Sequence, residues 1–201
     1  MVEMKIVGIS CSPRKGKSTF YALETCLQAA KEAVPGIETT LIELSETKMN
    51  GCVACGKCVK VLECSQEDDF PKMIPVLSDQ ELAGLVVATP VYFGSMTSQC
   101  KAFLDRCVML RRNGFLLRDK VGGVIAVGGV RNGGQELAIQ AVQAAMLVQD
   151  MVVVSEGRPT SHYGATLWSG HPDGIEKDAF GLETARNLGK RVAEVAARMH
   201  R

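Results

Sequence analysis

Short apolar runs alternate with amphipathic segments along this chain, and the pattern predicts five strands separated by helices. Short apolar runs that end in turn residues are typical of buried parallel strands. Such runs predict strands over Lys5–Ser10, Glu38–Leu44, Leu82–Pro90, Val121–Gly129 and Met151–Ser155. Apolar residues spaced by three and four positions predict amphipathic helices instead, over Ser18–Val34, about Thr97–Leu110, Gln135 to about Gln149, and roughly Asp178–Met199.

Two segments interrupt this alternation. The first, at about residues 50–66, follows the second strand and is rich in cysteine. It is predicted to be an insertion. After it, Asp68 or Asp69 can cap a short helix that begins near Pro71. Residues of about 157–174 show no clear period, so we expect an irregular cover there. Residues 1–201 are therefore predicted to form a single domain with one insertion.

Strands that alternate with helices predict an α/β fold, in which a parallel sheet is covered by helices on both faces. In such sheets, ligands bind beyond the carboxyl ends of the strands. We therefore expect the functional residues in the loops after the first, third and fourth strands.

Composition narrows the class of protein. The chain is 46% hydrophobic and 22% charged with a net charge of +1, which is ordinary for a globular domain. Its charges form no basic stripe, which argues against a nucleic-acid partner. No signal peptide precedes the first strand, and the longest apolar run is far shorter than the roughly 20 residues that span a bilayer. We expect a cytoplasmic protein that does not bind a membrane.

The loop after the first strand, "SCSPRKGKST", joins that strand to the start of a helix. Backbone N–H groups and the helix dipole favour an anion there. The loop adds hydroxyl donors and two cations, which suit a phosphate monoester: Ser10, Ser12, Arg14, Lys17, Ser18 and Thr19. A nucleoside triphosphate loop needs a glycine where Cys11 stands, Pro13 removes an N–H group, and no strand ends in a magnesium-binding Asp. An NTPase is therefore a distant alternative.

The loops after the third and fourth strands predict a surface for a flat ligand. "PVYFG" offers apolar and aromatic side chains, followed by a glycine that allows close approach. "GGVRNGG" lets the backbone pack against a planar group, and Arg131 either favours an anionic ligand or is simply solvated. The residues expected to contact the ligand are Pro90, Val91, Tyr92, Phe93, Gly94, Gly129, Arg131, Asn132 and Gly133.

Four of the eight cysteines lie close together, in the spacing C-x2-C-x2-C-x5-C: Cys52, Cys55, Cys58 and Cys64. A reducing cytosol argues against disulfides and favours metal or redox chemistry. Three soft thiolates separated by two successive two-residue gaps favour a [4Fe–4S] cluster, with zinc or free thiols as rivals. Cys26, Cys100 and Cys107 are predicted to be buried small hydrophobic residues.

These segments together resemble the iron–sulfur flavoprotein branch of the flavodoxin-like, NADPH-dependent FMN reductase superfamily. The resemblance covers nearly the whole chain and departs from the family at Cys11, where glycine is commoner. It implies a three-layer sandwich with strand order 2-1-3-4-5 and FMN, whose phosphate would bind the first loop and whose isoalloxazine ring would bind the loops after the third and fourth strands. It also implies subunit association, into a homodimer or homotetramer.

The leading hypothesis is a redox enzyme with FMN and a [4Fe–4S] cluster. Electrons would enter from a ferredoxin-like donor and leave to a small acceptor, with oxygen, peroxide or a quinone as candidates. The alternative is an NAD(P)H-dependent FMN or quinone reductase without a cluster, and a redox sensor is a third hypothesis. No single catalytic side chain is assigned, since the cofactor supplies the chemistry.

Cys11 and the C-terminal histidines leave two questions. Cys11 stands where a helix N-terminus can lower the pKa of a thiol, but we favour a tolerated small residue over a redox role. His162 and Tyr163 lie in the irregular stretch with Trp168. That stretch either covers a flavin or is a surface loop packed by its own aromatic residues, and we favour the second interpretation.

Overall fold

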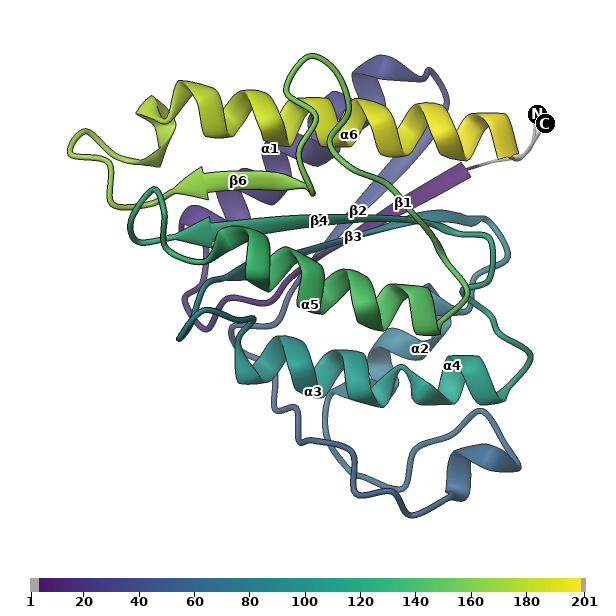
Figure 1. Ribbon diagram of the computed structural model, residues 1–201. Helices are drawn as coiled ribbons and strands as arrows, with labels where there is room; N and C mark the ends of the chain where they lie inside the picture. The colour runs from purple at the N-terminus through teal and green to yellow at the C-terminus, as the bar shows by residue number, and fades with distance from the viewer. Residues whose placement is uncertain (1–3, 200–201) are drawn as a thin grey trace.

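A parallel sheet with helices on both faces organises residues 4–199, which are those that the computed structural model describes (Figure 1). Its central strands follow the order β2-β1-β3-β4-β5, which confirms the flavodoxin-like topology expected from the sequence. The strands are β1 (Met4–Ser10), β2 (Ile37–Glu43), β3 (Leu82–Pro90), β4 (Val121–Gly128), β5 (Val152–Val153) and β6 (Ala165–Trp168).

The edge of the sheet beside β4 differs from the prediction. Only Val152 and Val153 of the expected fifth strand pair with β4. The chain then leaves the sheet and returns as β6, which pairs with the carboxyl half of β4. The stretch expected to be irregular over residues 157–174 thus contains a strand. With only four residues, β6 is too short for its alternation to stand out in the sequence.

The helices form the two outer layers (Figure 1). Helices α1 (Ser18–Ala33) and α6 (Ala179–Met199) pack together on one face of the sheet. The other face carries α2 (Ile74–Leu77), α3 (Ser98–Arg106), α4 (Val108–Arg112) and α5 (Gln135–Val148). The helix predicted over residues 97–110 is two helices, α3 and α4, separated by Cys107. Short 3-10 helices are η1 (Lys57–Val59), η2 (Phe70–Met73) and η3 (Ile175–Lys177).

Successive side chains of each central strand enter opposite cores. Ile6 and Val86 belong to the core under α1 and α6, whereas Val7 and Val87 belong to the core under α3 and α5. All nine residues of β3 are buried, as expected for a strand covered on both faces. The sheet is therefore a rigid support for the loops at its carboxyl edge.

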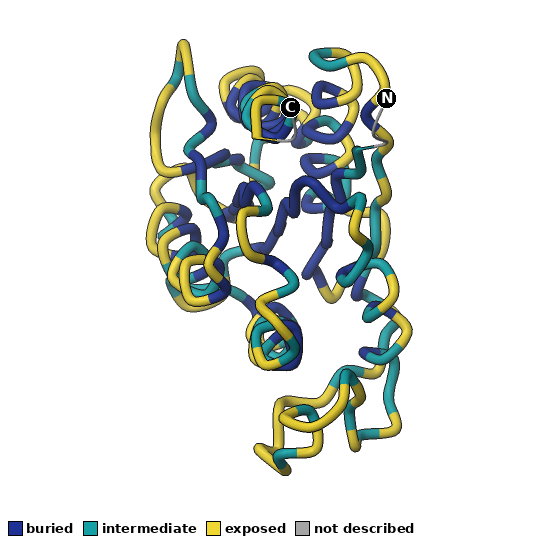
Figure 2. The backbone as a smooth tube through the Cα atoms, turned by 90° about the vertical axis from the view of Figure 1, so that its right-hand side faces the viewer, coloured by how far each residue is buried: buried dark blue, intermediate teal, exposed yellow. Residues whose placement is uncertain are grey.

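The cysteine-rich insertion lies outside this sandwich. Figures 1 and 2 show it as a separate lobe beyond α3 and α4, formed largely by exposed and half-buried residues. It leaves the sheet after β2 and returns at η2.

Among residues 4–199, no helix combines the length and the apolar character needed to cross a membrane.

Candidate functional site

The loop between β1 and α1 presents an open helix N-terminus at the carboxyl edge of the sheet. Lys17 is the N-cap of α1, and no side chain caps the first turn. The N–H of Gly16 donates to Glu43 Oε1 at 2.7 Å, while the Ser12 hydroxyl accepts from the N–H of Arg14 at 3.1 Å. Arg14 and Lys17 are exposed. This end of the 16-residue helix is available to an anion.

Ser10 supplies the clearest sign that this loop holds a ligand. Its side chain is fully buried, and its Oγ has no hydrogen-bond partner among the described residues. An unpaired buried hydroxyl costs about 1–3 kcal/mol. A bound phosphate oxygen at this loop would satisfy it.

The loop after β3 is a tight turn that displays an aromatic residue. Tyr92 and Ser95 exchange two backbone hydrogen bonds, at 2.9 and 3.1 Å. Between them, Phe93 has a φ of 49° and Gly94 a φ of 74°. Phe93 is fully exposed. A bulky residue in the left-handed region with no packing partner is costly, so this position is better explained by recognition than by stability.

The loop between β4 and α5 contacts that turn. Gly134 has a φ of 93°, and a Cβ atom on it would lie 3.1 Å from the Cα of Gly94. The side chain of Gln135 holds the loop, accepting from the N–H of Gly133 at 2.8 Å and donating to the carbonyl of Val130 at 2.7 Å. Two of the three loops therefore meet, and only glycine fits where they do.

Thr97 joins the loop after β3 to the loop after β1. Its hydroxyl donates to the carbonyl of Cys11 at 2.8 Å and accepts from the N–H of Cys100 at 3.1 Å, which caps α3. Its own N–H donates to Thr89 Oγ1 at 3.1 Å. The structure thus brings the three predicted ligand loops to one edge of the sheet.

The side chain of Arg131 contacts the C-terminal segment. Its guanidinium pairs with the buried carboxyl of Asp178 at 2.5 Å and lies 5.4 Å from the centre of the Trp168 ring. Asp178 also accepts from the N–H of Trp168 at 2.7 Å. Arg131 is therefore held in a defined position and is not a freely solvated side chain.

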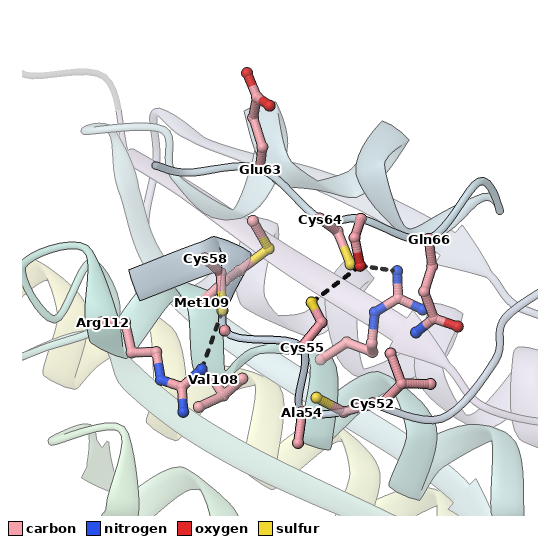
Figure 3. A pocket seen from close by; sticks show the side chains of 14 residues that line it. Cys52, Ala54, Cys55, Cys58, Glu63, Cys64, Gln66, Val108, Met109 and Arg112 are labelled. Atoms are coloured by element: carbon pink, nitrogen blue, oxygen red, sulfur yellow. Dashed lines mark hydrogen bonds between the residues drawn. The ribbon is translucent and has the colours of Figure 1, made fainter. Parts of the chain in front are cut away.

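The four clustered cysteines line one pocket beside α3 and α4 (Figure 3). Cys52 and Cys55 are exposed, and Cys58 and Cys64 are half-buried. As they stand, no three His, Cys, Asp or Glu side chains in residues 4–199 are grouped closely enough to hold a single metal ion. The pocket nevertheless gathers four soft donors from four separate positions of one loop.

Arg106, at the end of α3, is buried beneath this pocket and holds the loop. Its guanidinium forms two hydrogen bonds with Asp68, at 2.7 and 3.0 Å, and both side chains are only 1% exposed. It also donates to the carbonyl of Asn50 at 2.9 Å and to Cys64 Sγ at 3.1 Å. The pair therefore joins the segment before Cys52 to the segment after Cys64.

The charges of this pair support each other. Burial opposes the charge on Asp68, but hydrogen bonds from Arg106 and from the N–H of Asn50 outweigh it and lower the pKa of the carboxyl. Burial likewise opposes the charge on Arg106, but Asp68 and Cys64 outweigh it and raise the pKa of the guanidinium. Both groups remain charged at neutral pH.

Two further contacts act on the sulfur atoms. Arg112, at the end of α4, donates to Cys58 Sγ at 3.2 Å (Figure 3). Cys55 Sγ lies 3.0 Å from Ser65 Oγ, and this hydrogen bond, with the N–H of Lys57, lowers the pKa of the Cys55 thiol. These contacts thus orient Cys58 and favour the thiolate of Cys55.

Comparisons with known proteins agree with this geometry. Residues 4–166 match the family of NADPH-dependent FMN reductases. An iron–sulfur flavoprotein of Methanocaldococcus jannaschii is 43% identical over 192 residues, covering 96% of this chain and 97% of the relative. An iron–sulfur flavoprotein of Methanosarcina thermophila is 38% identical, covering 96% and 95%.

The chain belongs to the iron–sulfur flavoprotein branch of the NADPH-dependent FMN reductases. It is a flavin-dependent oxidoreductase of that family.

Solved structures share the fold of this iron–sulfur flavoprotein branch at low identity. RosB with a bound 8-demethyl-8-formylriboflavin-5'-phosphate intermediate superposes with a TM-score of 0.73 at 16% identity, covering 98% of this chain and 80% of RosB. A WrbA-like flavodoxin from Agrobacterium tumefaciens gives a TM-score of 0.64 at 20% identity, covering 97% and 98%. These likenesses support the flavodoxin-like sandwich and its α/β topology.

The residues present fit the two groups that the family name implies. A buried hydroxyl without a partner and an uncapped helix N-terminus suit the phosphate of FMN. Four thiols in one pocket, two of which accept hydrogen bonds from arginines, suit an anionic iron–sulfur cluster. When bound, FMN would exchange one or two electrons and the cluster one at a time.

The remaining cysteines have a different character. Cys11, Cys26, Cys100 and Cys107 are buried. Burial, and then the neighbouring thiol of Cys100, raises the pKa of Cys11; burial raises the pKa of Cys26 to about 12. The helix N-terminus does not activate Cys11, which supports its interpretation as a tolerated small residue.

Several residues that shape the site were absent from the sequence-based set. They are Asp68, Thr97, Arg106, Arg112 and Gln135, together with Glu156, which is buried and lies 2.7 Å from His162 Nδ1. Thr97 had a local signal, since threonine directly before a helix is a common N-cap. Asp68, Arg106 and Arg112 act through partners at least 38 positions away, so the sequence alone offered no signal for them. Gln135 and Glu156 have partners within six positions, but their roles depend on burial.

Proposed function

We propose that this protein binds FMN and a [4Fe–4S] cluster and passes electrons from a ferredoxin-like donor, through the cluster and the flavin, to a small acceptor. The observation that carries the proposal is the shared pocket of four cysteines, two of which accept hydrogen bonds from Arg106 and Arg112.

Flavin binding is supported by the three loops at the carboxyl edge. In the proposal, Ser10, Ser12, Arg14, Lys17, Ser18 and Thr19 bind the phosphate. The turn Pro90–Gly94 and the loop Gly129–Gly133 bind the ring. Phe93 offers an exposed aromatic surface, and Gly94 and Gly134 allow the backbone to approach a flat group.

Cluster binding is supported by the chemistry of the pocket. Cys52, Cys55, Cys58 and Cys64 supply four thiolates, and the pocket places positive charge beside them. A cluster with four thiolates is anionic, so hydrogen bonds and nearby cations favour its reduced form. Zinc sites usually use two C-x2-C hooks separated by a longer stretch, whereas the two two-residue spacings of this sequence share Cys55.

The position of the pocket bears on the electron route. Figure 1 shows the cysteine-rich lobe beyond α3 and α4, whereas the flavin loops lie at the carboxyl edge. A helix rises about 1.5 Å per residue, so α3 carries Arg106 about 14 Å from Thr97, and Arg112 follows in α4 after the break at Cys107. This separation favours transfer to the flavin of a neighbouring subunit, in a homodimer or homotetramer.

The deciding experiment is anaerobic purification followed by an absorption spectrum and analysis of iron, acid-labile sulfide and zinc. We expect one FMN and about four iron and four sulfide per chain. Flavin bands without iron or sulfide would overturn the cluster. The Cys58→Ala variant should lose iron and retain FMN.

A second candidate is an NAD(P)H-dependent FMN or quinone reductase without a cluster. The match to the NADPH-dependent FMN reductase family favours it. The same preparation separates the two, because the second candidate is reduced by NADPH alone. Flavin and cluster that accept electrons from ferredoxin, and none from NADPH, would exclude it.

A further inference from the structure

A buried carboxyl group outside the flavin loops binds the Nδ1 edge of a histidine ring. Glu156, which follows β5, is fully buried. Its Oε1 accepts from the backbone N–H of His162 at 2.5 Å and lies 2.7 Å from His162 Nδ1. Its Oε2 has no partner among the described residues. A carboxyl group that is buried to bind a single imidazole does little for stability, since its burial is costly.

The arrangement resembles that of a positioned acid–base histidine. A carboxylate on Nδ1 fixes the tautomer and the ring orientation, and it stabilises the imidazolium. The ring of His162 also stands edge-on to Phe180, with 6.1 Å between the ring centres. Nε2 forms no hydrogen bond within residues 4–199 and is free to act on a ligand.

His162 lines an open pocket of about 410 Å³ between the first turns of α5 and α6. Asn132, Gln140 and Thr166 give the pocket polar groups, and Leu137 and Phe180 give it apolar surface. Mixed lining of this kind suits a small molecule that carries both a flat apolar part and oxygen atoms.

This pocket borders the flavin loops. Arg131, Asn132 and Gly134 belong both to the loop between β4 and α5 and to the wall of the pocket. Gly134 in turn packs against Gly94 in the turn after β3. A molecule in the pocket would therefore lie beside the edge of the sheet at which the flavin ring is proposed to bind.

We propose that this pocket is an acceptor site and that His162, positioned by Glu156, is the proton donor for acceptors that take up protons with their electrons. Reduction of a carbonyl acceptor such as a quinone consumes two electrons, from the reduced protein, and two protons. At one oxygen an O–H bond forms as the Nε2–H bond of His162 breaks, and the N–H electron pair stays on Nε2. Solvent supplies the second proton and restores the first through the open pocket.

The inference rests on flavin-dependent redox activity and not on the cluster, and two acceptors test it. The anaerobic protein is reduced with dithionite and mixed with p-benzoquinone, which needs protons, or with ferricyanide, which takes electrons without protons. We expect His162→Gln to slow quinone reduction about 100-fold, the low end for general acid catalysis, and to leave ferricyanide reduction unchanged. The matched control is His171→Gln, whose ring lies against Trp168 and not in this pocket.

Glu156→Gln tests the positioning role. A glutamine still accepts from Nδ1–H but carries no charge, so we expect an intermediate loss with quinone, an unchanged apparent KM and an altered imidazole tautomer in 15N NMR spectra. Equal losses with both acceptors would overturn the proposal, because they indicate a fault in electron supply or folding. An unchanged rate with quinone would overturn it as well. If the wild-type protein contains no iron, the cluster proposal fails, but the comparison of the two acceptors still tests the role of His162.

Discussion

A buried ion pair at the end of α3 decides whether the cysteine loop has a fixed shape. Asp68 accepts two hydrogen bonds from Arg106 and one from the N–H of Asn50, where the lobe meets α3. Removing one member of a buried pair leaves an uncompensated charge and costs about 3–5 kcal/mol. We expect Asp68→Asn to lower the free energy of unfolding by roughly this amount, as measured by urea denaturation, and to reduce the iron content.

Asp105→Asn is the matched control. Asp105 also forms an ion pair, with Lys101 at 2.6 Å, but both side chains are about half exposed. Exposed pairs contribute at most about 1 kcal/mol, so stability and iron content should hardly change. Equal effects of the two variants would show that the buried pair does not hold the loop.

Arg112 offers a separate test of how the pocket affects the cluster. Arg106 is neutralised by Asp68, whereas Arg112 forms no ion pair within residues 4–199 and donates to Cys58 Sγ. Its net positive charge should stabilise the more negative, reduced cluster. We expect Arg112→Gln to retain iron and to shift the reduction potential of the cluster to more negative values, as measured by EPR-monitored titration.

The neighbouring Arg111→Gln removes the same charge from the same helix. Arg111 lies over the ring of Phe115, 4.9 Å from its centre, and does not line the cysteine pocket. It should leave the potential nearly unchanged, since its charge has no contact with the sulfur atoms and salt screens it. Equal shifts for both variants would mean that general charge, and not the bond to Cys58, sets the potential.

At the scale of elements, the loop between β1 and α1 should determine whether the protein prefers FMN to riboflavin, which lacks the phosphate. Ser10 Oγ is buried without a partner, so removing it costs the free protein no hydrogen bond. A hydrogen bond to a charged group is worth about 1.5–3 kcal/mol. We expect Ser10→Ala to weaken FMN binding about 10- to 100-fold by fluorescence titration, with no loss of thermal stability in the flavin-free protein.

Riboflavin, which lacks the phosphate, is the internal control for that titration. Its affinity should be the same for the wild type and for Ser10→Ala. If both ligands lose affinity equally, Ser10 contacts the ring or shapes the loop, and the phosphate assignment is wrong.

Helices and strands could be predicted from the sequence where the apolar pattern extended over several repeats. Helix α6 and strands β1, β3 and β4 carry enough apolar repeats for the sequence to place them within a few residues. The break at Cys107 was missed because the apolar pattern continues through it, from Phe103 to Leu110. Strand β6 was missed because it forms only by pairing with β4, which no local signal records.

At the scale of the whole molecule, topology explains why most of the candidate site could be predicted. Parallel strands bring their carboxyl ends to one edge, so loops far apart in sequence meet without any individual contact being known. Arg106 and Glu156 could not be predicted in this way. Asp68 and Arg106 are 38 positions apart, and the role of Glu156 depends on its burial, which follows from the path of the chain between β5 and β6.

The fold also divides the eight cysteines into two groups that chemistry can distinguish. The four cysteines of the lobe are exposed or half-buried, whereas Cys11, Cys26, Cys100 and Cys107 are buried, and burial raises the pKa of Cys26 to about 12. Alkylation requires both access and thiolate. In protein freed of iron by a chelator at pH 8, we expect iodoacetamide to label four cysteines rapidly by mass spectrometry, and all eight only in guanidinium chloride. Labelling of Cys11 as fast as Cys55 in the folded protein would contradict this, and would restore Cys11 as a candidate redox thiol beside the proposed phosphate loop.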